Sequence, residues 1–82
     1  MIRKMKLEIQ TTSGHAIEAL LVYEAETQQA INEAIDRDRK ELLDYMVTGD
    51  DHGRKSFVFG GNTHFMVKKT IIEAAQIMEP DF

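Results

Sequence analysis

Three histidines and one short acidic run are the residues of this chain best suited to bind a metal. Asp50, Asp51 and His52 are consecutive, so a single turn would offer two carboxylates and an imidazole to a divalent cation. Zinc sites usually take their ligands as close pairs, whereas His15, His52 and His64 lie far apart along the sequence. We therefore expect no structural metal and no cofactor. A weak metal or small-ligand site at this turn stays as an alternative.

The sequence indicates no catalytic group. A nucleophile needs an oriented base beside it, but Thr63 and His64 are adjacent, and adjacent side chains on a strand point to opposite faces. A chain of 82 residues also has little volume for a pocket of the usual ~300–1,000 Å³. We therefore predict that the protein is not an enzyme.

The segment FVFGGNTHFMV, residues 57–67, places two glycines between apolar runs. A Walker-type phosphate loop has glycines at fixed offsets followed by Lys and then Ser or Thr, and this segment has no lysine. The pattern instead favours a β-hairpin. A two-residue type II′ turn at Gly61 and Asn62 would place glycine at the first central position, as that turn requires.

This turn sets the register expected for the second hairpin, in which Phe57 pairs with Met66. It would divide the apolar side chains between two faces: Phe57, Phe59, His64 and Met66 on one, and Val58, Phe65 and Val67 on the other. A small sheet covered by one helix buries one face. We therefore predict that the face carrying Phe57, Phe59, His64 and Met66 forms an interface with a second copy, and that a dimer is the favoured oligomer.

Nucleic-acid binding is the second function class that the sequence raises. Small basic clusters surround the phenylalanines of the second hairpin, as on sheets that stack single-stranded bases. The net charge of −4, from ten Lys and Arg against fourteen Asp and Glu, argues against a nucleic-acid partner. A single-stranded nucleic-acid binder that uses this aromatic face is therefore kept as an alternative only.

The N-terminal third of the chain predicts a β-hairpin with one apolar face. That face collects the alternating residues Met5, Leu7, Ile9, Thr11, Ile17, Ala19, Leu21 and Tyr23. A three-residue loop at residues 12–14 pairs Ile9 with Ile17 and keeps these residues on the same side of the sheet. The loop ends at Gly14, where a type I turn with a bulge requires a positive φ.

Residues 25–40 predict a helix, with Thr27 as a possible N-cap. Residues 41–48 are ambiguous between a continuation of this helix and a strand. Tyr45, Val47 and Thr48 prefer extended structure, so we expect a strand at 43–48. It would join a three-strand meander with residues 55–59 and the strand that follows the glycines.

Residues 70–78 are ambiguous as well. Ile71, Ile72 and Met78 have helical spacing, and Thr70 with Glu73 would form a capping box before Pro80 ends the element. We expect a short helix here, with a strand as the alternative.

Taken together, the patterns predict one small α+β domain spanning residues 1–82. Its expected elements are a β-hairpin, a helix, a three-strand meander and a short C-terminal element, with a single layer of helix on a small antiparallel sheet. The chain has no cysteine and no apolar run of the ~20 residues that cross a membrane, and we expect a cytoplasmic protein. The expected function is that of a small acidic, non-enzymatic protein-binding or regulatory module that acts as a homo-oligomer.

Overall fold

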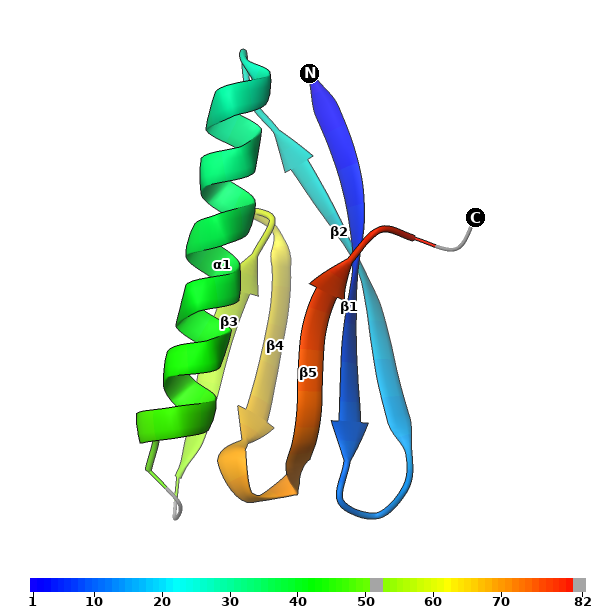
Figure 1. Cartoon of the computed structure of the whole chain (residues 1–82), viewed down its shortest axis with the longest axis vertical. Coiled ribbons are helices and arrows are strands. Elements are labelled where there is room, and N and C mark those ends of the chain that lie inside the picture. The colour runs from blue at the N-terminus through cyan, green and yellow to red at the C-terminus, as the bar shows by residue number, and fades with distance from the viewer. Residues whose placement is uncertain (51–52, 81–82) are drawn as a thin grey trace.

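The computed structural model describes residues 1–50 and 53–80. This part of the chain contains one helix and five strands (Figure 1). In chain order the elements are β1 (Ile2–Thr11), β2 (Ala16–Glu24), α1 (Gln28–Thr48), β3 (Arg54–Phe59), β4 (Thr63–Lys68), the 3-10 turn η1 (Lys69–Ile71) and β5 (Ile72–Met78). The α+β class is therefore confirmed. None of these elements is a helix apolar and long enough to cross a membrane.

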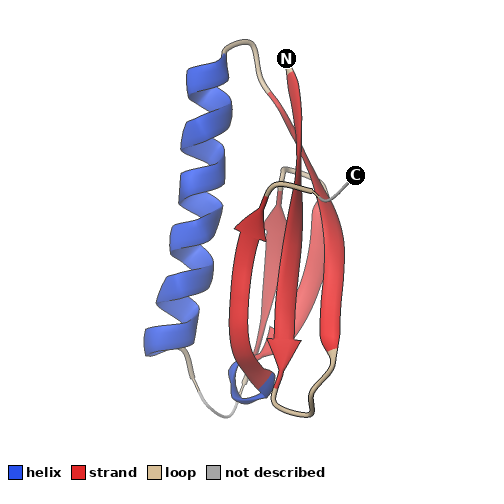
Figure 2. Ribbon diagram, turned by 45° about the vertical axis from the view of Figure 1, so that its right-hand side comes forward, coloured by secondary structure: helices blue, strands red, loops and turns tan. Residues whose placement is uncertain are grey.

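The strands form two antiparallel sheets instead of the single sheet that was expected. The first has the order β2-β1-β5, and the second is the hairpin of β3 and β4. Helix α1 runs along one side of the strands (Figures 1 and 2) and packs against β5 and β2. Its buried residues are Ile31, Ile35, Asp38, Leu42 and Tyr45.

The first hairpin has the predicted loop and register. Ile9 is the partner of Ile17, and the inward side chains of both strands lie on one face. The amide of Gly14 donates to the carbonyl of Thr11 over 3.0 Å, and Gly14 has φ of 89°. The alternation of apolar residues and the glycine therefore predicted this element correctly.

Helix α1 is longer than expected, and the strand expected at 43–48 is wrong. Thr27 is the N-cap, and its hydroxyl oxygen accepts a 3.1 Å hydrogen bond from the amide of Ala30. The helix continues through Tyr45 because the buried positions keep helical spacing to that residue. This packing outweighs the strand preference of Tyr45, Val47 and Thr48, and the meander is reduced to a hairpin.

The register predicted for the second hairpin is wrong by one residue. Phe57 pairs with Phe65 and not with Met66, and the loop has three residues, 60–62. Gly60 and Gly61 both have positive φ, of 63° and 80°. The observed register places all three phenylalanines on the core face, whereas the predicted register would put Phe65 on the face opposite to Phe57 and Phe59.

The helix expected at 70–78 is also wrong, because this segment forms strand β5. It adds to the edge of β1, where Leu7 pairs with Ile77 and Ile9 with Ala75. The expected capping box is not formed, since its first residue lies in η1. The ladder with β1 satisfies the backbone of this segment and buries Ile77, which a short terminal helix could not do.

The core lies between the two sheets and the helix. Its buried apolar members are Met5, Leu7, Ile9, Leu21, Tyr23, Ile31, Ile35, Leu42, Tyr45, Phe57, Phe59, Val67 and Ile77. Helix α1 also contacts the backbone of β5. The guanidinium of Arg39 donates two hydrogen bonds to the carbonyl of Ile77, from Nε at 3.2 Å and from Nη2 at 2.8 Å.

Candidate functional site

The predicted interface residues do not share one face. Phe57 and Phe59 are core residues with exposed fractions of 1% and 0%. Met66 is 62% exposed and lies, with His64, on the opposite side of the hairpin. The prediction that Phe57 and Phe59 are surface residues is therefore wrong, and its cause is the register error.

The phenylalanines instead form one packed aromatic cluster with Tyr45. The ring of Phe57 stacks on that of Phe65 with a centroid separation of 5.0 Å and meets the ring of Tyr45 edge-on at 5.4 Å. Phe59 meets Phe65 edge-on at 5.1 Å. Because these rings fill the core, Phe57 and Phe59 cannot stack on nucleic-acid bases, as the nucleic-acid alternative required.

The opposite side of the second hairpin carries exposed apolar side chains. We call it the outer hairpin face and define it by Val58, His64 and Met66 together with Leu20 of β2. Val58 is the cross-strand partner of His64, and Met66 is two residues further along β4 on the same side. The hydroxyl of Thr63 donates to the carbonyl of Leu20 over 3.2 Å, so β2 borders β4 at this point.

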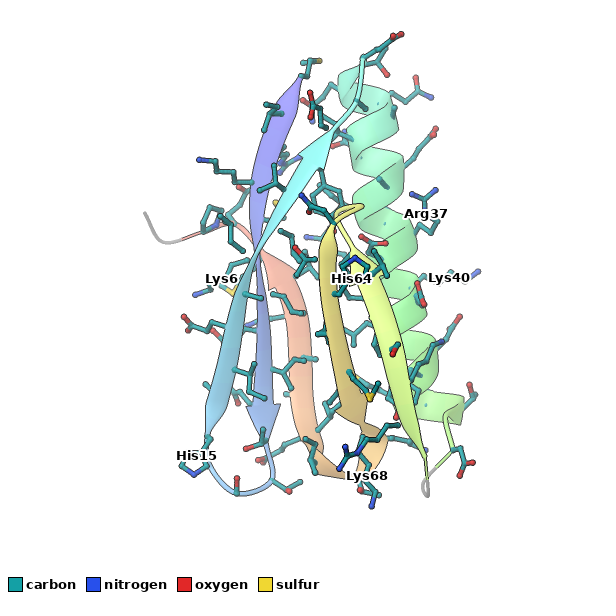
Figure 3. All side chains as sticks on the ribbon, turned by 180° about the vertical axis from the view of Figure 1, so that it is seen from behind. Lys6, His15, Arg37, Lys40, His64 and Lys68 are labelled. Carbon is teal, nitrogen blue, oxygen red and sulfur yellow. The ribbon has the colours of Figure 1, made fainter. Side chains whose placement is uncertain are left out.

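Opposite charges lie at the two ends of the outer hairpin face. Arg54 and Lys68 are partners at the open end of the hairpin. Figure 3 shows Lys68 at this end and His64 nearer to the tip. Near the tip, Glu24 and Glu41 line a cavity together with Gly60. The face is therefore basic at its open end and apolar in the middle, and at the tip it is bordered by two acidic residues, Glu24 and Glu41, and by Arg37.

A polar, partly enclosed cavity lies at the hairpin tip. It has a volume of about 280 Å³ and lies between the end of β2, the helix and the glycine loop. We call it the tip cavity. Its lining residues are Tyr23, Glu24, Ala25, Ile31, Ala34, Arg37, Asp38, Glu41, Val58, Gly60 and Gly61.

A buried carboxylate holds the walls of the tip cavity together. Asp38 is 6% exposed, although it sits in the middle of the helix. Its Oδ2 atom accepts a 2.8 Å hydrogen bond from the hydroxyl of Tyr23 and a 3.1 Å hydrogen bond from the amide of Gly60. One carboxylate oxygen therefore links α1 to β2 and to the glycine loop.

The Tyr23 phenol is held in its neutral form. Burial raises its pKa well above the ordinary tyrosine value, and the hydrogen bond to Asp38 raises the pKa further. A phenol with a raised pKa is a poor nucleophile or base at neutral pH. Tyr23 therefore acts in the cavity as a hydrogen-bond donor.

Gly60 is required where the loop approaches β2. Its φ is 63°, and a Cβ atom at this position would lie 2.9 Å from the carbonyl oxygen of Val22. Only glycine accepts both the backbone angle and this distance without displacement. The close approach brings the Gly60 amide within reach of Asp38.

Sequence reasoning missed the tip cavity, although one signal for it was present. Asp38 occupies a helical position between Ile35 and Leu42, in the stripe that faces the core. A lone acid in an apolar stripe indicates a buried carboxylate that needs partners. The partners themselves come from distant segments and could not be paired with Asp38 from spacing alone.

The histidines do not converge on a metal site. His15 lies at the first loop and His64 on the outer hairpin face, far apart in Figure 3. Asp51 and His52, two of the three residues of the alternative metal turn, lie outside the described residues. Within residues 1–50 and 53–80, no group of three His, Cys, Asp or Glu side chains could hold a metal ion.

Comparison with known proteins gave no match: no protein-family description, curated protein or solved structure is similar to this chain.

Proposed function

We propose that this chain is a small non-enzymatic protein-binding module that self-associates through the outer hairpin face. One observation carries the proposal. Val58 and Met66 are 47% and 62% exposed on the outer side of the hairpin, and Leu20, whose carbonyl accepts from Thr63 next to them, is 45% exposed. Contiguous exposed apolar side chains on a soluble protein are typical of interaction surfaces, and a polar rim around them is typical too.

The arrangement of charge favours a second copy as the partner. An isologous dimer brings the same surface patch together in opposite directions. If two outer hairpin faces meet end for end, Arg54 and Lys68 of each copy approach the acidic tip of the other. The apolar side chains would then meet in the middle. Complementary charge of this kind sets the orientation and speeds association.

The tip cavity supports a binding role and gives no support to catalysis. No Ser, Thr, Lys or His is among its lining residues, and the Tyr23 phenol is kept protonated. A carboxylate held by two donors is suited to positioning and recognition.

We also propose a cytoplasmic location for the protein. This is in line with a sequence that has no cysteine.

The experiment is sedimentation velocity across a hundredfold range of protein concentration. We expect wild type to change from one chain of 9.4 kDa to two chains within the micromolar range. Met66→Glu should stay monomeric, because it places a charge in the apolar middle of the face. Its matched control is Val47→Glu. Val47 is 68% exposed on α1, outside the outer hairpin face, and this substitution should leave the dimer intact.

Two results would count against the proposal. If wild type remains a monomer at several hundred micromolar, the proposed self-association is wrong. If the dimer persists in Met66→Glu but dissociates in Val47→Glu, the interface lies on the helix and not on the outer hairpin face. Both variants change exposed side chains, so circular dichroism should show unchanged folding in each.

A further inference from the structure

We propose that the tip cavity is a binding site for an ammonium or guanidinium group, which Asp38 Oδ1 holds by a charge-assisted hydrogen bond. The inference does not rest on self-association. It centres on Asp38, which lies outside the outer hairpin face, although Val58 belongs to both surfaces, and it is tested with small cations.

The two carboxylate oxygens of Asp38 differ in their hydrogen bonds. Both hydrogen bonds of this side chain reach Oδ2. Across residues 1–50 and 53–80, every fully buried side-chain oxygen or nitrogen has a partner. Oδ1 has no donor among these residues, so it is accessible, and Asp38 lines the tip cavity. Asp38 therefore offers an acceptor atom that is not fully buried, in a 6% exposed residue that lines the cavity.

The charge around the cavity is acidic in sum. Glu24, Asp38 and Glu41 line it, and Arg37 is the one basic residue among the described lining residues. Glu41 also pairs with Lys55 at 3.7 Å, so Glu24 and Asp38 carry most of the excess. The acidic excess repels an anion and attracts a cation. The amide of Gly60, which could have bound an anion, is already used by Asp38. A ligand must therefore bring donors, and charged donors are favoured.

The shape of the cavity suits a small cation. Ile31, Ala34 and Val58 provide apolar wall beside the carboxylate. A volume of about 280 Å³ is at the small end of ligand pockets. Such a site suits a compact cation with a short aliphatic stem, since the head reaches Asp38 and the stem contacts the wall. A free small amine and a lysine or arginine side chain of another chain share this chemistry.

The test is a titration followed by the amide resonances of the uniformly labelled full chain. Ethylammonium and ethylguanidinium are the probes, and tetramethylammonium is the control cation without an N–H donor. The amide of Gly60 bonds Oδ2 of the same carboxylate, so its chemical shift reports a ligand on Oδ1. We expect a saturable millimolar shift of Gly60 with the two donor cations and none with tetramethylammonium.

Asp38→Asn is the decisive variant. The asparagine oxygen still accepts from Tyr23 and Gly60, while its amide nitrogen presents a donor to the cavity in place of an acceptor. We expect at least tenfold weaker binding of ethylguanidinium. Glu33→Gln removes one negative charge from an exposed helix position outside the cavity, and should change the affinity by less than twofold. If Asp38→Asn does not fold, Glu41→Gln replaces it, with an expected weakening of several-fold.

Arg37→Ala should strengthen cation binding, which a variant that had lost its structure could not do. Arg37 is a cation at the cavity and lowers the affinity for a second cation. Its removal should therefore strengthen the binding of ethylguanidinium about two- to fivefold. A weaker or unchanged affinity would contradict the charge argument.

The source of the cation is distinguished by a second ligand. The peptide Gly-Gly-Arg-Gly-Gly presents the same guanidinium as a side chain. Equal or tighter binding of the peptide assigns the site to a partner's basic residue, and binding of ethylguanidinium alone assigns it to a free small amine. Either result supports the proposal. It is overturned if neither ligand shifts Gly60, or if tetramethylammonium shifts it equally.

Discussion

Gly60 shows how a single residue sets the geometry of the tip cavity. It combines a positive φ with an approach to the Val22 carbonyl that leaves no room for a side chain. Gly61 also has a positive φ, but a Cβ atom there would meet nothing within 4 Å. The two neighbours therefore separate the cost of backbone conformation from the cost of a steric contact.

We expect Gly60→Ala to lower the free energy of unfolding by at least about 2 kcal/mol, and Gly61→Ala by about 1 kcal/mol. A left-handed backbone angle costs an alanine roughly 1–2 kcal/mol. At position 60, overlap with the carbonyl of Val22 adds to this cost. Urea denaturation of both variants measures the two values. Equal losses would mean that β2 moves away from the loop without cost.

Tyr23 makes stability depend on pH in the alkaline range. In the unfolded chain its phenol loses a proton near the ordinary tyrosine pKa of about 10. In the folded chain burial raises this pKa, so the phenol stays protonated. The unfolded state therefore binds fewer protons above pH ~10, and the stability that Tyr23 contributes is present below this pH and falls above it.

Tyr23→Phe tests this dependence. Near pH 8 the variant should be less stable by about 1.5–3 kcal/mol, the usual worth of a hydrogen bond to a charged group. The gap between wild type and variant should narrow as pH rises from 9 to 11. Tyr45 is present in both proteins, so the comparison isolates Tyr23. A gap that stays constant over this range would refute the pKa assignment.

At the scale of elements, the helix depends on its first residues. The hydroxyl of Thr27 accepts from the amide of Ala30, which otherwise has no partner within the helix. Thr27→Ala should therefore cost about 1 kcal/mol. The matched control is Thr48→Ala at the other end, where the hydroxyl donates to the carbonyl of Asp44.

A bond from a threonine hydroxyl back to the preceding turn adds little to helix stability. The change at Thr48 should therefore stay within about 0.5 kcal/mol. Thermal unfolding followed at 222 nm compares the two variants. Equal losses at both ends would show that threonine packing, and not the cap, is responsible.

The elements that sequence predicted correctly are those governed by local signals. The first hairpin follows from strict alternation and from Gly14, and the helix start follows from Thr27. The second hairpin has apolar residues on both faces. Two registers that differ by one residue therefore both give an apolar face, and the sequence pattern does not distinguish them. Only packing against Tyr45 and the core selects the register that buries Phe57 and Phe59 and packs Phe65 against them.

The remaining errors come from contacts between distant segments. Residues 43–48 prefer extended structure locally, and the core side of the helix overrides this preference. Residues 72–78 become a strand because β1 offers an edge, which spacing within the segment cannot reveal. The tip cavity depends on Tyr23, Asp38 and Gly60 together, and no pattern within one element brings these three residues side by side.

For the whole molecule, substitutions in the core should lower the free energy of unfolding more than substitutions at the surface. Phe59 is fully buried, so Phe59→Ala should lower the free energy of unfolding by about 3–5 kcal/mol. A domain of this size has roughly 4–12 kcal/mol in total. Met66 is mostly exposed, and Met66→Ala should stay within about 0.5 kcal/mol.

Both substitutions are compared by urea denaturation at one low protein concentration, so that self-association does not contribute. A large loss in Met66→Ala with a small loss in Phe59→Ala would contradict the observed register, in which Phe59 lies in the core and Met66 lies outside. It would also place Phe59 at the surface.

Strand β1 lies between β2 and β5, and this order bears on how the chain is made. Lys6 pairs with Met78, so the two long edges of β1 are completed at very different times during synthesis. β2 can pair as soon as the first hairpin has left the ribosome, but the other edge stays open until β5 has been translated. An open strand edge is a site of aggregation, and long-range pairing is slow. The newly made chain should therefore be most vulnerable to misassembly just before its fifth strand emerges, and most dependent on chaperones at that moment.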